Sequence, residues 1–244
     1  MSHEEVLRAI NRRVDISGVR ADVSLQELGK IAMAAKHYQF ICAFAMPCFT
    51  PQLIQLLKDE PNVHIGATVG FPSGADTTAI KVASAQEQIR MGVHELDMVI
   101  NIGAVKSGRY DIMEADVRAV VETARGLPVK SILEVAYLTD SEICRAAETA
   151  VKAGVKFVKT GTGWAGKPTT LDTIRLIRKT IGNSAHIKAA GGIRSLDTML
   201  DMIAEGCDRF GIGLHSIINI MKERDERLGI RDDYSLDYSG QDQC

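Results

Sequence analysis

Short apolar segments rich in β-branched residues alternate along the chain with stretches that carry an apolar residue every three or four positions. The first pattern is typical of buried strands and the second of amphipathic helices. The spacing between the apolar segments, about 20 to 35 residues, is the length of a repeated strand–helix unit. The predicted strands are residues 12–16, 40–45, 63–69, 95–101, 130–135, 155–160, 186–190 and 209–213.

The stretches between these segments carry the signals of helices. Isoleucines over 174–181 recur at helical spacing, as expected for a helix that covers a sheet. Ser24 with Glu27, and Thr139 with Glu142, have the spacing of a capping box. In that motif each side chain binds the other residue's free backbone N–H. We therefore expect a helix to begin at each of these pairs.

Strands that are joined by helices, with connections too long for hairpins, form parallel sheets. Eight such units favour closure into a (β/α)8 TIM barrel of the α/β class, with an open doubly wound sheet as the alternative. No linker rich in proline or serine interrupts the chain before residue 230. The sequence therefore predicts one barrel domain over residues 1–230, followed by a polar C-terminal tail over 231–244.

The composition is that of an ordinary globular protein, with 45% hydrophobic and 25% charged residues and a formal net charge of -2. This balance gives no general attraction to nucleic acid or to an anionic membrane. No apolar run reaches about 18 residues, and the polar start of the chain lacks the apolar core of a signal peptide. The five cysteines are scattered, which indicates neither a disulfide framework nor a zinc site. The expected setting is the reducing cytoplasm.

Three charged residues lie where strands of such a barrel carry reacting groups. Lys159 stands near the end of the sixth strand. Either burial lowers its pKa and leaves a neutral, nucleophilic amine, or its side chain extends to the rim of the barrel and stays charged. Lys188 has the same place on the next strand, so the two ammonium groups would disfavour each other, unless Lys188 binds phosphate. Asp97 lies among apolar neighbours and either pairs with an ammonium group or shuttles protons.

Glycines follow the last two strands. Gly191 and Gly192 come after the seventh strand, and Gly211 and Gly213 end the eighth. Loops at these places commonly bind phosphate through backbone N–H groups, although plain tight turns are the alternative. The segment 161–167 lacks P-loop spacing, and neither a dinucleotide fingerprint nor a histidine metal motif is present. We therefore predict no metal and no cofactor.

Taken together, these motifs resemble the deoxyribose-phosphate aldolases, which are class I Schiff-base aldolases on a (β/α)8 barrel. The resemblance runs from about residue 14 to residue 213. It implies that Lys159 is the Schiff-base lysine, Lys188 the second active-site lysine and Asp97 the proton-relay aspartate. It is densest in residues 69–74, 95–108, 138–143, 157–163 and 187–194.

The same resemblance implies a substrate and phosphate site, although the chain departs from the family there. The second strand runs Cys-Ala-Phe-Ala-Met-Pro over 42–47, Trp164 is unusually bulky, and Leu214 follows Gly213 where the family places serine hydroxyls. These departures predict a weakened preference for phosphate. The residues implied in binding are Asp15, Ser17, Gly163, Gly191, Gly192, Gly211 and Gly213.

The activity implied by the resemblance is that of an aldehyde-lyase without a cofactor. It would cleave 2-deoxy-D-ribose 5-phosphate to glyceraldehyde 3-phosphate and acetaldehyde. Two alternatives stay open: the same Schiff-base chemistry on another sugar or ketose phosphate, and a barrel that only binds a metabolite. The expected partner is a small sugar phosphate, with no nucleic acid and no membrane, and assembly into a homo-oligomer stays open.

Overall fold

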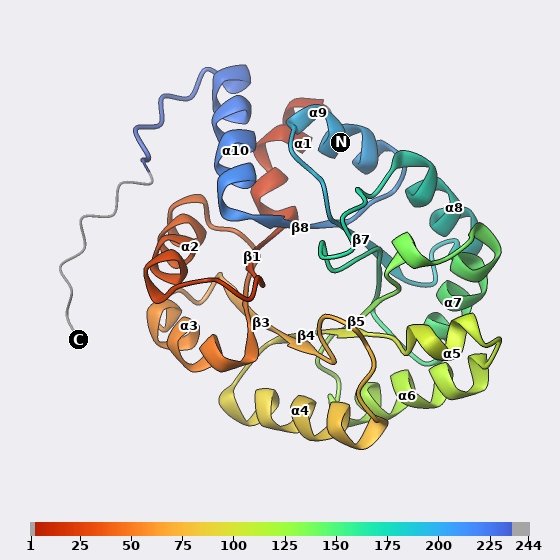
Figure 1. Cartoon of the computed structure of the whole chain (residues 1–244). Coiled ribbons are helices and arrows are strands. Elements are labelled where there is room, and N and C mark those ends of the chain that lie inside the picture. Colours follow the sequence, from red (N-terminus) through yellow and green to blue (C-terminus); the bar gives the residue numbers. More distant parts are fainter. Residues whose placement is uncertain (1–2, 236–244) are drawn as a thin grey trace.

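The computed structural model describes residues 3–235 and contains a closed barrel of eight parallel strands inside a ring of helices (Figure 1). Each strand pairs with the next one in the chain, and β8 pairs with β1 to close the ring. The predicted (β/α)8 TIM barrel is therefore confirmed. The strands are β1 (Val14–Gly18), β2 (Cys42–Ala45), β3 (His64–Val69), β4 (Glu95–Val99), β5 (Val129–Ile132), β6 (Phe157–Lys159), β7 (His186–Ala190) and β8 (Arg209–Gly213).

Helices connect successive strands and cover the outside of the barrel (Figure 1). None of the helices within residues 3–235 is long and apolar enough to cross a membrane. The α-helices are α1 (His3–Arg8), α2 (Leu25–Tyr38), α3 (Thr50–Leu57), α4 (Thr78–Met91), α5 (Ile102–Lys106), α6 (Tyr110–Thr123), α7 (Asp140–Lys152), α8 (Leu171–Ile181), α9 (Leu196–Ala204) and α10 (Leu214–Leu228). Short 3₁₀ helices are η1 (Ile10–Arg13), η2 (Pro47–Phe49) and η3 (Val135–Tyr137).

The first predicted strand begins two residues too early. Arg12 and Arg13 belong to η1, and β1 starts at Val14. The guanidinium of Arg12 donates to the backbone carbonyl of Gln39 at 2.7 Å, so it ties the entrance of β1 to the segment before β2. The fifth strand ends sooner than predicted, at Ile132. The reason is that Glu134, two residues later, has a left-handed backbone (φ 54°) that no strand continues through.

One of the two expected capping boxes is complete. At the start of α7, Thr139 accepts from the backbone of Glu142, whose side chain in turn accepts from the Thr139 N–H at 2.8 Å. At the start of α2, Ser24 accepts from the backbone of Glu27 at 3.1 Å. The Glu27 carboxylate instead receives Arg20 at 2.8 Å, so the reciprocal half of that predicted box is wrong.

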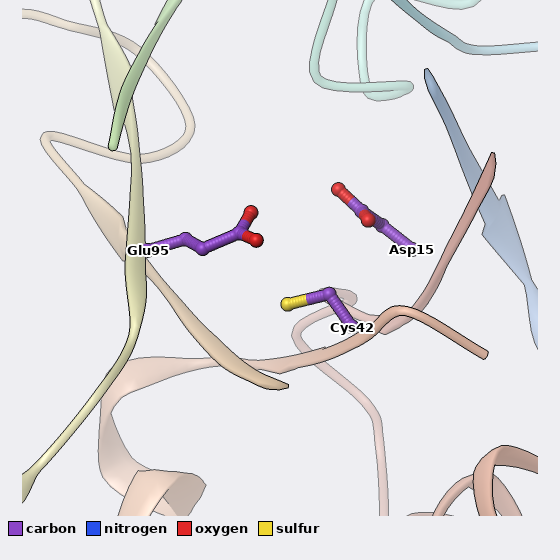
Figure 2. Close-up of side chains that lie close together, drawn as sticks. All are labelled: Asp15, Cys42 and Glu95. Carbon is purple, nitrogen blue, oxygen red and sulfur yellow. The ribbon is translucent and has the colours of Figure 1, made fainter. Parts of the chain in front are cut away.

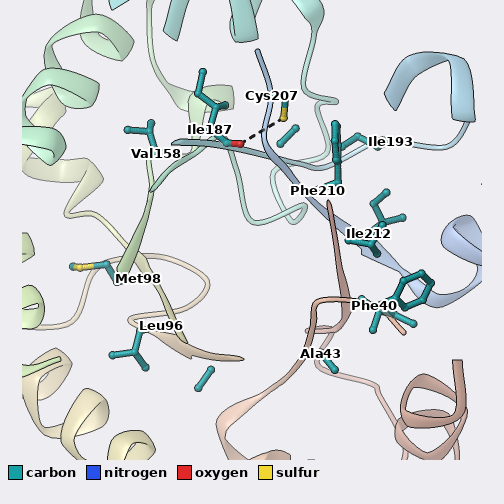
Figure 3. Packing of buried hydrophobic residues seen from close by; sticks show 14 of the residues in the cluster. Phe40, Ala43, Leu96, Met98, Val158, Ile187, Ile193, Cys207, Phe210 and Ile212 are labelled. Atoms are coloured by element: carbon teal, nitrogen blue, oxygen red, sulfur yellow. Dashed lines mark hydrogen bonds between the residues drawn. The ribbon is translucent and has the colours of Figure 1, made fainter. Parts of the chain in front are cut away.

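The apolar core lies between the outer face of the barrel and the helices. Alternation along β4 turns Leu96 and Met98 outward, and Figure 3 shows them with Val158 and Phe210 among the buried side chains. Each such side chain contributes about 1.5–3 kcal/mol by leaving water. The same alternation turns Asp97 toward the interior of the barrel, where it contacts charged residues of other strands.

Inside the barrel, aromatic rings lie beside the charged side chains. The ring centroid of Phe44 is 4.2 Å from Nζ of Lys188 and 4.8 Å from Nζ of Lys130. Phe44 fits because β3 carries Gly66 beside it, and a Cβ built there would lie 2.1 Å from the ring. The interior is thus largely filled by side chains, and a cavity opens at its C-terminal end.

The predicted tail is described as far as residue 235, and residues 236–244 lie outside the described residues. Its first part packs on α2. A carboxylate oxygen of Asp232 lies 3.0 Å from His37 Nε2, and the ring of Tyr234 stacks on that of His37 with centroids 4.6 Å apart. These contacts attach residues 232–234 to the barrel domain.

Candidate active site

The three candidate catalytic residues meet inside the barrel. Lys159 ends β6 and is in register with Lys188 on β7, so the two side chains are neighbours. One oxygen of Asp97, Oδ2, accepts from both: the Nζ of Lys159 lies 2.8 Å away and that of Lys188 2.6 Å away. All three side chains are buried. The structure therefore brings together the residues that the sequence selected.

A larger ion-pair network surrounds these residues. Asp15 binds Lys188 and Arg209, each at 2.6 Å. Lys130, which the sequence analysis did not select, binds Asp97 Oδ1 at 2.9 Å and also contacts Glu95. The members of this ion-pair network are Asp15, Glu95, Asp97, Lys130, Lys159, Lys188 and Arg209.

The network contains three carboxylates and four cationic side chains, so one cation has no carboxylate to balance it. Burial of an uncompensated charge is costly. Burial lowers the pKa of Lys159 to about 8, and the charges of Lys188 and Lys130 act in the same direction against the opposing pull of Asp97. Lys159 therefore gives up its proton more readily than an ordinary lysine does.

Asp97, Lys130 and Glu95 keep their charges. Burial raises the pKa of the Asp97 carboxyl, but the ammonium groups around it outweigh burial and hold that pKa well below its usual value. Burial lowers the pKa of Lys130, and the nearby carboxylates reverse this effect and raise it. The pKa of Glu95 is likewise lowered, to about 2, because Lys130 and Arg209 outweigh its burial.

A cavity of about 310 Å³ opens above the amines of Lys159 and Lys188 at the C-terminal end of the barrel. Lys159 and Lys188 line it, whereas Asp97 and Asp15 lie beneath and reach it only through their contacts with the lysines. Of the predicted binding residues, those that line the cavity are Ser17, Gly163, Gly191, Gly192, Gly211 and Gly213.

Glycine loops and the first turn of α10 line the outer end of this cavity. Gly192 has a positive φ of 77°, and a Cβ there would lie 2.4 Å from Pro168, so the loop needs glycine at this position. Helix α10 begins at the cavity with no side-chain cap, and Ser216 in its first turn lines the wall. The sequence analysis missed Ser216 because it looked for serines directly after β8. A helix N-terminus with a free first turn is suited to an anion.

The loop that follows Lys159 is held in place by hydrogen bonds to Glu134. Thr162 donates to Glu134 through its hydroxyl and, at 3.2 Å, through its backbone N–H. The next residues carry Trp164 over the cavity, where its indole N–H donates to the carbonyl of Val19 at 2.8 Å. The ring also meets Phe71 edge to face, with centroids 5.9 Å apart. Trp164 thus joins the loops that follow β1, β3 and β6.

Asp15, Cys42 and Glu95 approach one another from β1, β2 and β4, as Figure 2 shows. Such a donor set resembles a metal site, but its carboxylates are already engaged. Arg209 bridges Asp15 at 2.6 Å and Glu95 at 3.2 Å, and Lys130 contacts both carboxylates. Burial keeps the pKa of the Cys42 thiol well above its usual value. A divalent ion here would therefore meet two fixed cations and a neutral thiol.

The chain is similar to known aldolases over most of its length, and residues 7–222 match the DeoC/LacD aldolase family. The deoxyribose-phosphate aldolase of Sinorhizobium medicae is 43% identical over 86% of this chain and 85% of its own. That of Klebsiella pneumoniae is 39% identical over 91% of this chain and 90% of its own. The solved aldolase QR15 superposes with a TM-score of 0.84, at 31% identity over 91% of this chain and 99% of its own. On these grounds the chain belongs to the DeoC/LacD family and is an aldolase, a carbon–carbon lyase.

Proposed function

We propose that the chain is a class I aldolase that cleaves 2-deoxy-D-ribose 5-phosphate through an imine on Lys159. The observation that carries this proposal is the placement of one buried amine, with its pKa lowered to about 8, at the floor of a cavity. A neutral amine is the nucleophile that attacks a carbonyl, and the iminium that follows withdraws electrons without a metal.

Lys159 Nζ attacks C1 of the open-chain sugar, and loss of water from the carbinolamine leaves an iminium. The C3 hydroxyl then gives its proton to a base, the C2–C3 bond breaks, and glyceraldehyde 3-phosphate leaves. The electron pair remains as an enamine, which takes a proton at C2, and water releases acetaldehyde and the free amine. Two proton transfers of this kind are the usual task of a positioned acid–base pair.

Lys188 and Asp97 are suited to those proton transfers. Lys188 lines the cavity and is within 2.6 Å of Asp97 Oδ2, which also accepts from Lys159. Once the Lys188 ammonium group has given a proton to the departing carbinolamine hydroxyl, its neutral amine accepts the proton of the C3 hydroxyl and later returns one to C2 of the enamine. Asp97 Oδ2 stays hydrogen-bonded to Lys188 and faces Lys159 during these transfers. Reduction of the imine with borohydride in the presence of the sugar phosphate, followed by peptide mass analysis, tests whether the adduct lies on Lys159.

The substrate's phosphate is placed at the outer end of the cavity, on the glycine loop and the first turn of α10. Ser216 supplies the hydroxyl there, and Arg194 is an exposed cation on the same wall. Arg20 also lines this end, but its guanidinium is held by Asp22 at 2.9 Å and Glu27 at 2.8 Å. Arg194 is thus the better placed of these two arginines to receive a phosphate.

Replacement of Ser216 by alanine is expected to weaken cleavage of the phosphorylated substrate only. A hydrogen bond to a charged group contributes about 1.5–3 kcal/mol, so kcat/KM for 2-deoxyribose 5-phosphate should fall by about tenfold to a hundredfold. The value for unphosphorylated 2-deoxyribose should stay unchanged. Ser184→Ala, at an exposed position before β7, is the matched control. Equal losses on both substrates would remove Ser216 from the phosphate site.

A second candidate keeps the imine on Lys159 and changes the substrate. Trp164 joins three loops over the cavity and lies against Phe71, so the mouth is narrower and more apolar than glycine loops alone would make it. Another aldose or ketose phosphate would then be preferred. A panel of such phosphates compared by kcat/KM distinguishes the two candidates.

Activity is expected to survive metal chelators. The iminium takes the place of a metal as the electron sink, and the clustered carboxylates of Asp15 and Glu95 already pair with cationic side chains. Turnover measured after dialysis against EDTA should equal that of untreated protein. Loss of turnover in EDTA that zinc restores would contradict the class I mechanism.

A further inference from the structure

Lys130 takes no part in the proposed chemistry, yet it lies at the centre of the barrel. Its side chain is fully buried, it does not line the cavity, and it bridges Glu95 and Asp97. A lysine with no access to solvent or substrate needs a structural or electrostatic reason for its charge, because burial of an ammonium group is costly.

Asp97 divides its two oxygens between different amines. Oδ2 faces Lys159 at 2.8 Å and Lys188 at 2.6 Å, whereas Oδ1 accepts from Lys130 at 2.9 Å. The single negative charge of Asp97 is thus shared among three ammonium groups. The positive charge of Lys130, held beside Asp97, opposes a proton on Lys159.

Glu95 contacts the same ammonium group of Lys130 that Asp97 does. It lies 3.2 Å from Arg209 Nη2. It also lies 3.1 Å from Nδ1 of His64, whose side chain is 43% exposed. The remaining charge that faces Lys130 is Asp15, with Oδ2 at 3.7 Å, while the Phe44 ring lies beside it on β2.

We propose that Lys130 and Glu95 are positioning residues that act through Asp97 and keep the Lys159 amine free of its proton. Lys130 holds Oδ1 of Asp97, and its positive charge opposes a proton on Lys159. Glu95 contacts the same ammonium group and offsets part of that charge. This inference rests on the proposed Schiff-base role of Lys159. It adds an explanation of why Lys159 loses its proton, and the residues responsible lie one layer deeper in the barrel than Lys159 and Lys188.

Counting charges supports the same assignment. Three carboxylates balance three cations of the ion-pair network, and the raised pKa of Lys130 and of Arg209 keeps both protonated. The Cys42 thiol stays neutral because burial raises its pKa. Glu134, at the end of β5, binds Thr162 and makes no ion pair with the network. The cation in excess is then assigned to Lys159, whose pKa burial lowers to about 8, and the charge of Lys130 contributes to that lowering.

The test is the pH dependence of imine formation in three variants. Lys130→Met removes a cation and should move the midpoint for reductive trapping of acetaldehyde on Lys159 upward, by about one pH unit or more. Glu95→Gln removes an anion and should move it downward. The double variant removes one charge of each sign and should return the midpoint close to that of the unmodified protein. Only an electrostatic role predicts opposite shifts that cancel.

Lys81→Met is the matched control. Lys81 is also fully buried and bonded to a carboxylate, Asp116 at 2.6 Å, but this pair lies outside the barrel between α4 and α6. Its loss should lower thermal stability and leave the midpoint in place. Equal loss of trapping at every pH in Lys130→Met and Glu95→Gln, with no shift, would overturn the inference. If Lys130→Met does not fold, the downward shift in Glu95→Gln decides alone. Failure of the unmodified protein to form any adduct on Lys159 would instead overturn the proposed function.

Discussion

Lys159→Ala is expected to abolish both turnover and covalent trapping. The imine nitrogen is the Nζ of this residue, so alanine removes the nucleophile and the electron sink together. Loss of a nucleophile in an enzyme of this kind lowers kcat by roughly 10⁴-fold or more. Borohydride reduction in the presence of 2-deoxyribose 5-phosphate should add no mass to the peptide over 157–163, in contrast to the unmodified protein.

Lys156→Ala is the matched control for this experiment. It lies three residues earlier, just before β6, and is exposed to solvent. Its alanine variant should keep both the adduct and the turnover. If Lys159→Ala retained the adduct, or carried it on Lys188, the assignment of the Schiff base would be wrong.

Lys188→Leu is expected to move the pH dependence of turnover to the alkaline side. Its ammonium group lowers the pKa of Lys159, which burial and this charge bring to about 8. Removing a like charge raises that pKa by about one to two units, and each unit lowers the neutral fraction below the pKa by about tenfold. Turnover near pH 7 should therefore fall by about tenfold to a hundredfold and recover in part as the pH is raised.

The pH profile separates this role from phosphate binding. A phosphate ligand would raise KM at every pH and leave the midpoint of kcat unchanged. That result would move Lys188 from the proton transfers to the substrate's anionic end. Lys188→Leu and Lys130→Met should shift the midpoint in the same direction, but only Lys188, which lines the cavity, should also change KM.

The barrel was predictable from sequence because its strands are short, buried and evenly separated. All eight predicted strands overlap the observed ones, with their starts within about two residues. At the start of β1 the predicted type of element is wrong: Arg12 and Arg13 have the pattern of strand residues but belong to the 3₁₀ helix η1. The local sequence pattern does not reveal this difference. The side chains of Arg12 and Arg13 donate to the backbone carbonyls of Gln39 and Cys207, which are distant in the sequence.

The centre of the site was predictable for a similar reason. Lys159 and Lys188 stand at equal depth on neighbouring parallel strands, so their meeting follows from the fold. Lys130 was missed although it is in register with Asp97 on the adjacent strand. A lysine at the start of an apolar strand is usually at the rim, and only the closed ring shows that this one points at Asp97. The hydrogen bonds from Thr162 to Glu134 also depend on the left-handed backbone of Glu134, which the sequence does not predict.

The ion-pair network is divided unevenly along the chain. Its carboxylates, Asp15, Glu95 and Asp97, all come from β1 and β4, whereas its cations come from β5, β6, β7 and β8. Each half of the barrel alone would therefore bury a surplus of one sign, which is costly until the other half arrives. The two halves are electrostatic complements. The charges of each half are therefore compensated only where the ring is closed.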